Sequence, residues 1–229
     1  MKRQVKKETS LLKKYLIKNR QLSLVYNKQV VYNVSRKYIY LYERGFLTMA
    51  FIDLMKAKAK QDKQTIVLPE SKDKRTLIAA AQILQEGTAD LIMVGKEEKI
   101  MDGAGWLEVD LTGLKVVDPD TDPKFDHYAE TLFELRKHKG MTKEKAEELL
   151  KTDYITYGVM MVKEKDADGL VAGACHATAD TLRPALQILK TAPGTELVSG
   201  FFIMDVPNCE YGSNGTFLFA DCGLNQDPN

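Results

Sequence analysis

Apolar and polar positions from residue 51 onward form two alternating patterns, short apolar runs typical of buried strands and apolar positions spaced as in helices. Short apolar runs, several of them closed by Pro or Gly, predict strands over residues 65–69, 89–94, 115–119, 168–173, 196–204 and 215–221. Apolar residues three or four positions apart predict helices over residues 51–61, 73–87, 124–139, 142–151 and 181–191, and a buried helix over 154–163. Strands alternate with helices, so we expect an α/β fold with a mostly parallel sheet and flanking helices.

Residues at the ends of these segments predict where the helices start and stop. Asp73 is a favourable N-cap for the second helix, and Gly87 is a stop signal at its end. The last helix is expected to begin near Asp180 or Thr181. Pro184 is then in its first turn, because Pro disrupts the interior of a helix.

The formal net charge of +1 is the sum of two dissimilar parts. Residues 1–48 hold 12 Lys and Arg against two acids, a charge of +10, whereas residues 49–229 hold 21 against 30, a charge of −9. The first part also holds six of the ten tyrosines. Such a break in composition predicts that a domain boundary, or a junction between segments of different origin, lies near Met49.

Four interpretations compete for the basic segment 1–48. A secretory signal does not fit, because Lys18 and Arg20 interrupt the apolar stretch and no small-residue cleavage site follows. A transit peptide is disfavoured by the excess of Lys and the absence of Ala, and a nucleic-acid-binding arm has only a weak signal. We favour a start codon assigned too far upstream, with the evolved protein beginning at Met49.

Composition and motifs exclude several classes of protein and site. The chain is 44% hydrophobic and 28% charged, as globular proteins are, and no apolar run is long enough for a transmembrane helix. Three cysteines do not make a disulfide scaffold and suit a reducing, cytoplasmic setting. The sequence has no G-x-G-x-x-G or Walker loop. His127, His138 and His176 are not spaced as metal ligands, so we expect no metal.

The segment 168–191 carries the most informative local pattern. A strand ends and a helix begins there, so that free N–H groups, the hydroxyls of Thr178 and Thr181, and the guanidinium of Arg183 together make an anion site. In an open α/β sheet this place lies at the carboxyl end of a strand, where ligands bind. On these residues alone a second interpretation is equally open, in which the hydroxyls are helix caps and Arg183 is a solvated surface charge.

Several stretches of the chain resemble the phosphate acetyltransferase (phosphotransacetylase) family, in the family's order. They are TIVLPE with RTLIAAA, YAETLFELRKHKGMT, YGVMMVKEKDADGLV, GLVAGACHATADTLRPALQILKTAPG and VPNCEYGSNGTFLFADCGLNQDP, and they cover essentially all of residues 50–229. The resemblance implies the two-domain α/β fold of the isocitrate and isopropylmalate dehydrogenases, usually as a homodimer. It also implies reversible acetyl transfer between coenzyme A and phosphate, with acetyl-CoA as a substrate and no bound cofactor.

The resemblance also implies roles for individual residues. The expected substrate-binding residues are Arg136, Arg183, Thr178 and Thr181. Cys209 in PNCEYG and His176 match positions near the family's site, and for both we favour a structural role. Ala177 stands where many relatives have Ser, which puts one hydrogen bond in doubt.

The family resemblance implies that part of the enzyme is absent from this sequence. The family's Asp base, which deprotonates the coenzyme's thiol, comes from the carboxyl-terminal half, so no catalytic residue is expected in this chain. We expect residues 49–192 to be a first α/β domain, incomplete at its C-terminal return, and residues 193–229 to be the opening strands of a truncated second domain. Such a fragment is expected to be inactive or weakly active, with apolar strand faces exposed.

Three hypotheses for the function follow, and the first is favoured. It is an amino-terminal part of a cytoplasmic phosphate acetyltransferase acting on acetyl-CoA, phosphate and acetyl phosphate. The second is a non-catalytic regulatory module that binds acyl-CoA or phosphate. The third is a phosphate butyryltransferase. Neither nucleic acid nor a membrane is expected as a partner.

Overall fold

The structure is a computed structural model that describes residues 51–220 apart from 196–197, 199, 207–208 and 214. The helices are α3 (Phe51–Gln61), α4 (Lys74–Glu86), α5 (Glu97–Trp106), α6 (Phe125–Arg136), the 3₁₀ turn η1 (Lys137–Lys139), α7 (Lys143–Thr152), α8 (Tyr154–Lys163) and α9 (Thr178–Ile188). The strands are β1 (Thr65–Leu68), β2 (Asp90–Val94), β3 (Lys115–Val117), β4 (Gly169–Leu170), β5 (Phe201–Asp205) and β6 (Thr216–Ala220). The predictions for residues 1–48, and those for residues after 220, lie outside the described residues.

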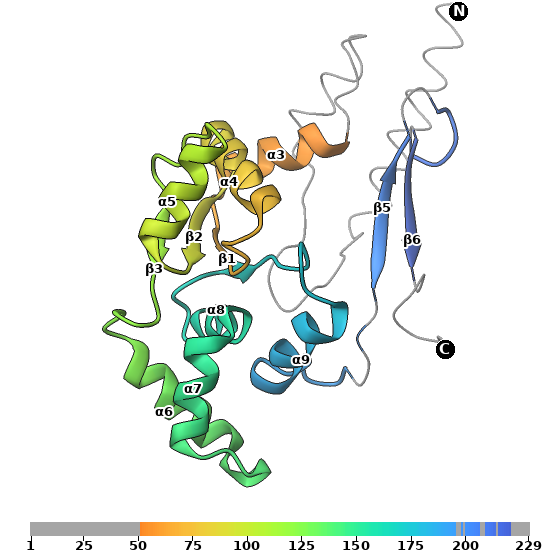
Figure 1. The fold of residues 1–229 in the computed structure, drawn as a ribbon. Helices are drawn as coiled ribbons and strands as arrows, with labels where there is room; N and C mark the ends of the chain where they lie inside the picture. Colours follow the sequence, from red (N-terminus) through yellow and green to blue (C-terminus); the bar gives the residue numbers. More distant parts are fainter. Residues whose placement is uncertain (1–50, 196–197, 199, 207–208, 214, 221–229) are drawn as a thin grey trace, which may run out of the picture. The chain divides into compact units, whose positions relative to one another are not determined.

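A four-stranded parallel sheet in the order β3-β2-β1-β4 confirms the predicted α/β fold (Figure 1). On one side of β1, Val67 lies opposite Ile92 of β2; on the other side, it lies opposite Leu170 of β4. The chain therefore adds β2 and β3 on one side of β1 and then crosses to the opposite side. This crossing creates a topological switch point between β1 and β4, the place where open α/β sheets bind ligands.

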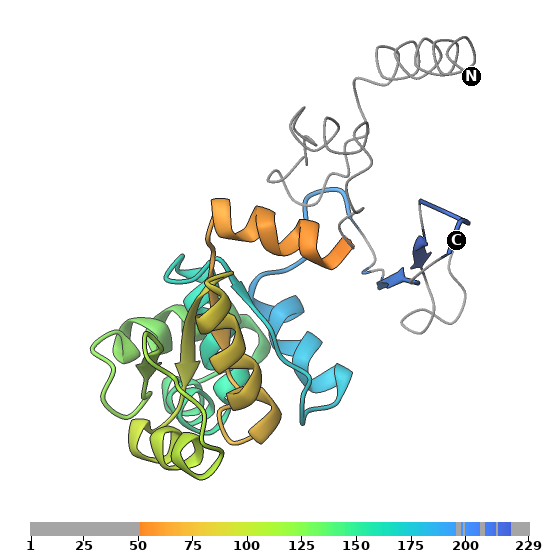
Figure 2. The same cartoon turned by 90° about the horizontal axis from the view of Figure 1, so that it is seen from above.

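Successive strand residues face opposite layers of helices, as the pleat of a strand requires. Val67, Ile92 and Val94 belong to a buried cluster with residues of α6, α7 and α8. Leu68 and Met93, their immediate neighbours, belong to a second cluster with residues of α4 and α5. Figure 2 shows strands of this sheet with helices on both sides. The two layers fix the positions of β1 and of the segments that leave its carboxyl end.

The predicted ends of α4 are confirmed. Asp73 is the N-cap, and its carboxylate accepts a hydrogen bond from the backbone N–H of Arg75 at 2.8 Å. Gly87 ends the helix in the left-handed region at φ 65°, where a residue without Cβ carries no steric cost.

Helix α5 was not predicted from the sequence. Gly103 and Gly105 lower the helix propensity of the segment Glu97–Trp106. Packing compensates for this, since Ile100 and Ala104 are buried in the cluster shared with α4. A Cβ on Gly103 would come within 2.9 Å of a methyl group of Leu77, so this glycine permits the close approach of α5 to α4.

Helix α9 corrects two predictions. It begins at Thr178, earlier than predicted, because Ala177 serves as the N-cap with an extended backbone although its side chain makes no capping hydrogen bond. Pro184 therefore lies inside the helix rather than in its first turn, and Arg183 lies beside it. Pro184 lacks the N–H that the carbonyl of Asp180 would accept, but Asp180 is exposed and its carbonyl can bind water instead.

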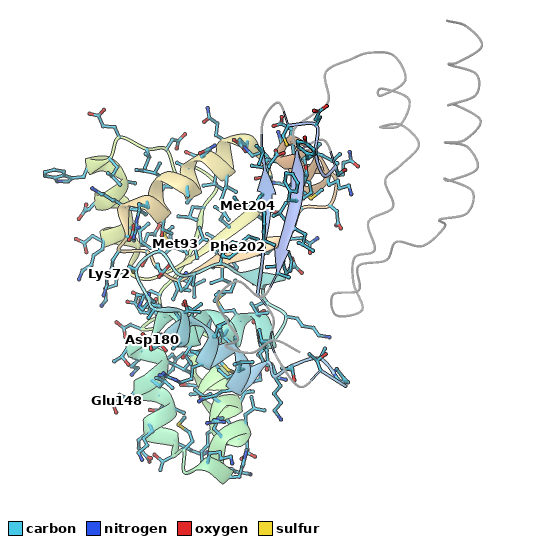
Figure 3. The ribbon with its side chains drawn as sticks, turned by 90° about the vertical axis from the view of Figure 1, so that its right-hand side faces the viewer. Lys72, Met93, Glu148, Asp180, Phe202 and Met204 are labelled. Carbon is cyan, nitrogen blue, oxygen red and sulfur yellow. The ribbon has the colours of Figure 1, made fainter. Side chains whose placement is uncertain are left out.

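Strands β5 and β6 form an antiparallel pair, with Ile203 opposite Leu218. Both faces of this pair carry exposed apolar side chains: Phe202 and Met204, which Figure 3 labels, lie on one face of β5, and Phe201 and Ile203 lie on the other. This agrees with the expected exposure of apolar faces on these strands. None of the helices that the structure describes is long and apolar enough to cross a membrane.

Candidate functional site

A cavity of about 560 Å³ lies at the switch point, beside the segments that leave the carboxyl ends of β1 and β4. Its lining includes Glu70 and Lys72 after β1, Arg136 of α6, Asp153 and Tyr154 before and in α8, Cys175 and His176 after β4, and Asp180 and Arg183 of α9. Figure 3 labels Lys72 and Asp180, which lie on different elements of this cavity. The cavity is therefore lined by chain segments that are more than a hundred positions apart in sequence, such as those of Glu70 and Arg183.

Glu70 anchors the loop that follows β4. Its side chain is only 3% exposed, and its two oxygens accept hydrogen bonds from three successive backbone N–H groups. The donors are Ala174 at 2.7 Å, Cys175 at 2.9 Å and His176 at 3.1 Å. Arg75 donates to the carbonyl oxygen of Ala174 from the other side. The loop is thus held at both its N–H and its carbonyl groups.

The hydrogen bonds to Glu70 keep its carboxylate ionised. Burial by itself raises the pKa of Glu70, but the donors from Cys175, the His176 ring and Ala174 outweigh it and lower the pKa to about 2. A carboxylate that accepts several N–H groups has this property because the hydrogen bonds favour its charged form. Glu70 is therefore a fixed negative charge over the whole physiological pH range.

Cys175 lies next to this carboxylate and is not an activated nucleophile. Burial of the thiol and the neighbouring Glu70 raise the pKa of Cys175, which disfavours the thiolate. Donor atoms of Glu70, Cys175 and His176 lie within 4.8 Å of one another, a spacing that a metal ion could use. However, the Glu70 oxygens already accept N–H groups from the loop and from the His176 ring, so the arrangement is a hydrogen-bonded anchor.

Arg136 and Arg183 bring positive charge to the cavity from two separate helices. Arg136 is the last residue of α6, and Arg183 lies in the middle of α9. The guanidinium of Arg183 is 62% exposed and lies 3.6 Å from the carboxylate of Asp180, so the pair is weak and the guanidinium can still bind a ligand. Lys72 adds a third cation, with its ammonium 5.7 Å from the centre of the Tyr154 ring.

The structure brings together three of the six residues singled out in the sequence: Arg136, Arg183 and His176 all line the cavity. Thr178 and Thr181 lie in the first turns of α9 and are not among the lining residues. The hydroxyl of Thr181 instead donates to the carbonyl of Ala177 at 3.4 Å. Cys209 lies between β5 and β6, with its side chain partly buried, and does not line the cavity.

Glu70 and Lys72 are cavity residues that the sequence analysis did not single out. Glu70 follows the buried strand TIVL and Pro69 directly, and a carboxylate at the carboxyl end of a parallel strand is a signal that could have identified it. Its partners after β4 could not have been identified in this way, because they are more than a hundred positions away.

Comparison with known proteins identifies the family of the chain. The sequence profile of the family described as "Phosphate acetyl/butaryl transferase" matches residues 50–229. The chain belongs to this family. It is 55% identical over 181 residues to the phosphate acetyltransferase of Acetivibrio thermocellus, a match that covers 79% of this chain and 54% of that protein.

Solved structures of this family have the same fold. A phosphotransacetylase from Streptococcus pyogenes is similar with a TM-score of 0.70 and 38% identity, covering 79% of this chain and 54% of that one. The EutD phosphotransacetylase from Staphylococcus aureus is similar with a TM-score of 0.69 and 34% identity, covering 79% and 53%. The chain thus spans about half the length of the relatives that it matches.

Proposed function

We propose that this chain supplies the phosphate-binding part of a phosphate acetyltransferase, which transfers an acetyl group reversibly between coenzyme A and phosphate. The observation that carries the proposal is the cavity at the switch point, where Arg136 and Arg183 present guanidinium groups from two helices. Guanidinium groups bind phosphate oxygens in pairs of parallel hydrogen bonds, so these two residues suit inorganic phosphate and acetyl phosphate.

The charges of the cavity residues indicate which part of the reaction this chain supports. Acetyl-CoA and phosphate give acetyl phosphate and the free thiol of coenzyme A, so phosphate attacks the thioester carbonyl in one direction and the thiolate attacks acetyl phosphate in the other. Arg136, Arg183 and Lys72 stabilise the phosphoryl oxygens, which carry negative charge on both sides of the reaction. We assign no proton-transferring base in this chain. Cys175 is not assigned as a nucleophile, since its thiol pKa is raised.

Removal of either arginine tests the phosphate site. We expect Arg183→Gln and Arg136→Gln each to weaken the binding of inorganic phosphate and acetyl phosphate by about 10-fold to 100-fold, because each loses charge-assisted hydrogen bonds. Isothermal titration calorimetry at one fixed low salt concentration measures this. Lys99→Gln is the matched control, since Lys99 is exposed on α5 and does not line the cavity. Equal affinity of the wild type and both arginine variants would refute the proposed phosphate site.

The proposal includes acetyl rather than butyryl transfer, in line with the relatives that are named phosphate acetyltransferases. Acetyl phosphate is therefore expected to compete with inorganic phosphate more strongly than butyryl phosphate does. The resemblance further suggests a cytoplasmic homodimer, which remains a prediction. Formation of acetyl-CoA by the purified chain would decide against the alternative of a non-catalytic binding module.

A further inference from the structure

The Glu70 carboxylate fixes the hydrogen on the imidazole of His176. Nδ1 of His176 lies 2.7 Å from Oε1 of Glu70, the oxygen that also accepts the backbone N–H groups of Cys175 and His176. An ionised carboxylate only accepts hydrogen bonds, so Nδ1 must carry a hydrogen and donate it. In the neutral ring, Nε2 then has a free lone pair.

Nε2 of His176 remains available to a ligand. The side chain is 43% exposed and lines the cavity, and no hydrogen bond joins Nε2 to any residue that the structure describes. The free ring nitrogen therefore belongs to the same cavity as Arg136 and Arg183.

We propose that Glu70 is a positioning residue that holds His176 with Nδ1–H on the carboxylate, so that Nε2 binds an oxygen of the phosphoryl group. This inference rests on the proposed phosphate site. Beside the contacts of the two guanidinium groups, it gives the phosphoryl group a neutral, directional contact with Nε2 of His176. Inorganic phosphate at neutral pH keeps at least one hydroxyl group, which donates to the lone pair of Nε2. When Nε2 is protonated, it donates to an unprotonated oxygen instead.

This contact distinguishes phosphate from sulfate. Sulfate has no hydroxyl group near neutral pH, so a neutral Nε2 cannot bind it and only the protonated ring contributes. The charged and titratable groups around the ring are Glu70 and Lys72 after β1, Asp73 and Arg75 at the start of α4, Arg136 of α6, Asp153 and Tyr154 at α8, Cys175 in the loop, and Asp180 and Arg183 of α9.

The tautomer of each histidine can be measured directly. Two-bond ¹⁵N–¹H correlation spectra of the full chain above pH 7.5 should show His176 with its hydrogen on Nδ1. His127 is the internal control, because its Nε2 lies 2.8 Å from the Glu164 carboxylate, outside the cavity, and should carry the hydrogen there. In Glu70→Gln, the His176 signals should change and those of His127 should stay. A hydrogen on Nε2 of His176 in the wild type would refute the proposal.

Binding measurements separate positioning from folding. His176→Asn keeps an N–H near the position of Nδ1, and thus the hydrogen bond to Glu70, but removes Nε2. We expect it to fold as the wild type does and to bind inorganic phosphate about tenfold more weakly at pH 7.5. The matched control is His127→Gln, which keeps the donor to Glu164 and should bind phosphate with unchanged affinity.

A comparison of sulfate with inorganic phosphate at pH 7.5 tests the contact made by Nε2. Because sulfate has no hydroxyl group to donate to a neutral Nε2, sulfate affinity should differ little between the wild type and His176→Asn, whereas the affinity for inorganic phosphate should differ about tenfold. If His176→Asn equals the wild type with both anions while Arg183→Gln is impaired, the role of Nε2 is refuted and the phosphate site stands. If neither variant changes the affinity, both proposals fail.

Discussion

Replacement of Glu70 by Gln should lower the free energy of unfolding at pH 7 by about 3 kcal/mol, the difference that corresponds to a pKa of about 2 in the folded chain against an ordinary 4.5. The physical reason is that the carboxylate accepts the N–H groups of Ala174, Cys175 and His176 in a buried place, whereas a neutral amide accepts them more weakly and turns a donor toward them. Urea unfolding followed by circular dichroism measures the difference.

The pH dependence of this effect has a definite sign. The pKa of Glu70 is lowered by folding, so its contribution is fully present above the unfolded pKa of about 4.5 and is lost as the pH falls toward the folded pKa of about 2. The stability difference between the wild type and Glu70→Gln should therefore shrink between pH 4.5 and pH 2. Glu98→Gln, at an exposed position of α5, is the control. A difference that stays constant down to pH 2.5 would contradict the assigned hydrogen bonds.

Substitution of Gly158 by Val is expected to cost about 3 kcal/mol of stability. Gly158 lies in the buried helix α8, and a Cβ there would come within 2.7 Å of a methyl group of Leu170 in β4 and 2.9 Å of one of Val67 in β1. Val67 is fully buried and has a stiff, short side chain, so it cannot move away easily. The helix would have to shift from the two strands that border the cavity.

Gly105→Ala provides the contrast to this substitution. Gly105 is also helical, but nothing lies within 4 Å of a Cβ built on it. The alanine should therefore stabilise the chain by about 0.5 kcal/mol through its higher helix propensity. Thermal unfolding of both variants under the same conditions gives the comparison. A Gly158→Val chain as stable as the wild type would show that α8 does not approach the sheet as closely as the structure indicates.

The sequence was sufficient for most of the elements but not for their tertiary roles. Asp73 and Gly87 mark the ends of α4 correctly because caps are local hydrogen bonds and local backbone preferences. Helix α5 was missed because its stability comes from the burial of Ile100 and Ala104, and not from propensity. The early start of α9 was missed because Ala177 takes an N-cap position without a capping side chain.

For the candidate site, too, the sequence predicted individual residues but not their arrangement in space. Arg136 and Arg183 could be singled out from the sequence, since each lies in a distinctive motif of the family. Their meeting in one cavity depends on how α6 and α9 pack on the sheet. Thr178 and Thr181 illustrate the limit of local reasoning, because the same hydroxyl types serve ligand binding or the helix backbone, and the structure places them outside the cavity lining.

By itself, the sequence determined the alternation of strands and helices apart from α5, because short apolar runs and the helical period of 3.6 residues are local properties of the chain. The tertiary structure alone decided that β4 pairs with the free side of β1, and that Glu70 meets residues 174–176 there. Those hydrogen bonds join groups more than a hundred positions apart, and no local pattern encodes which side of β1 the returning strand takes.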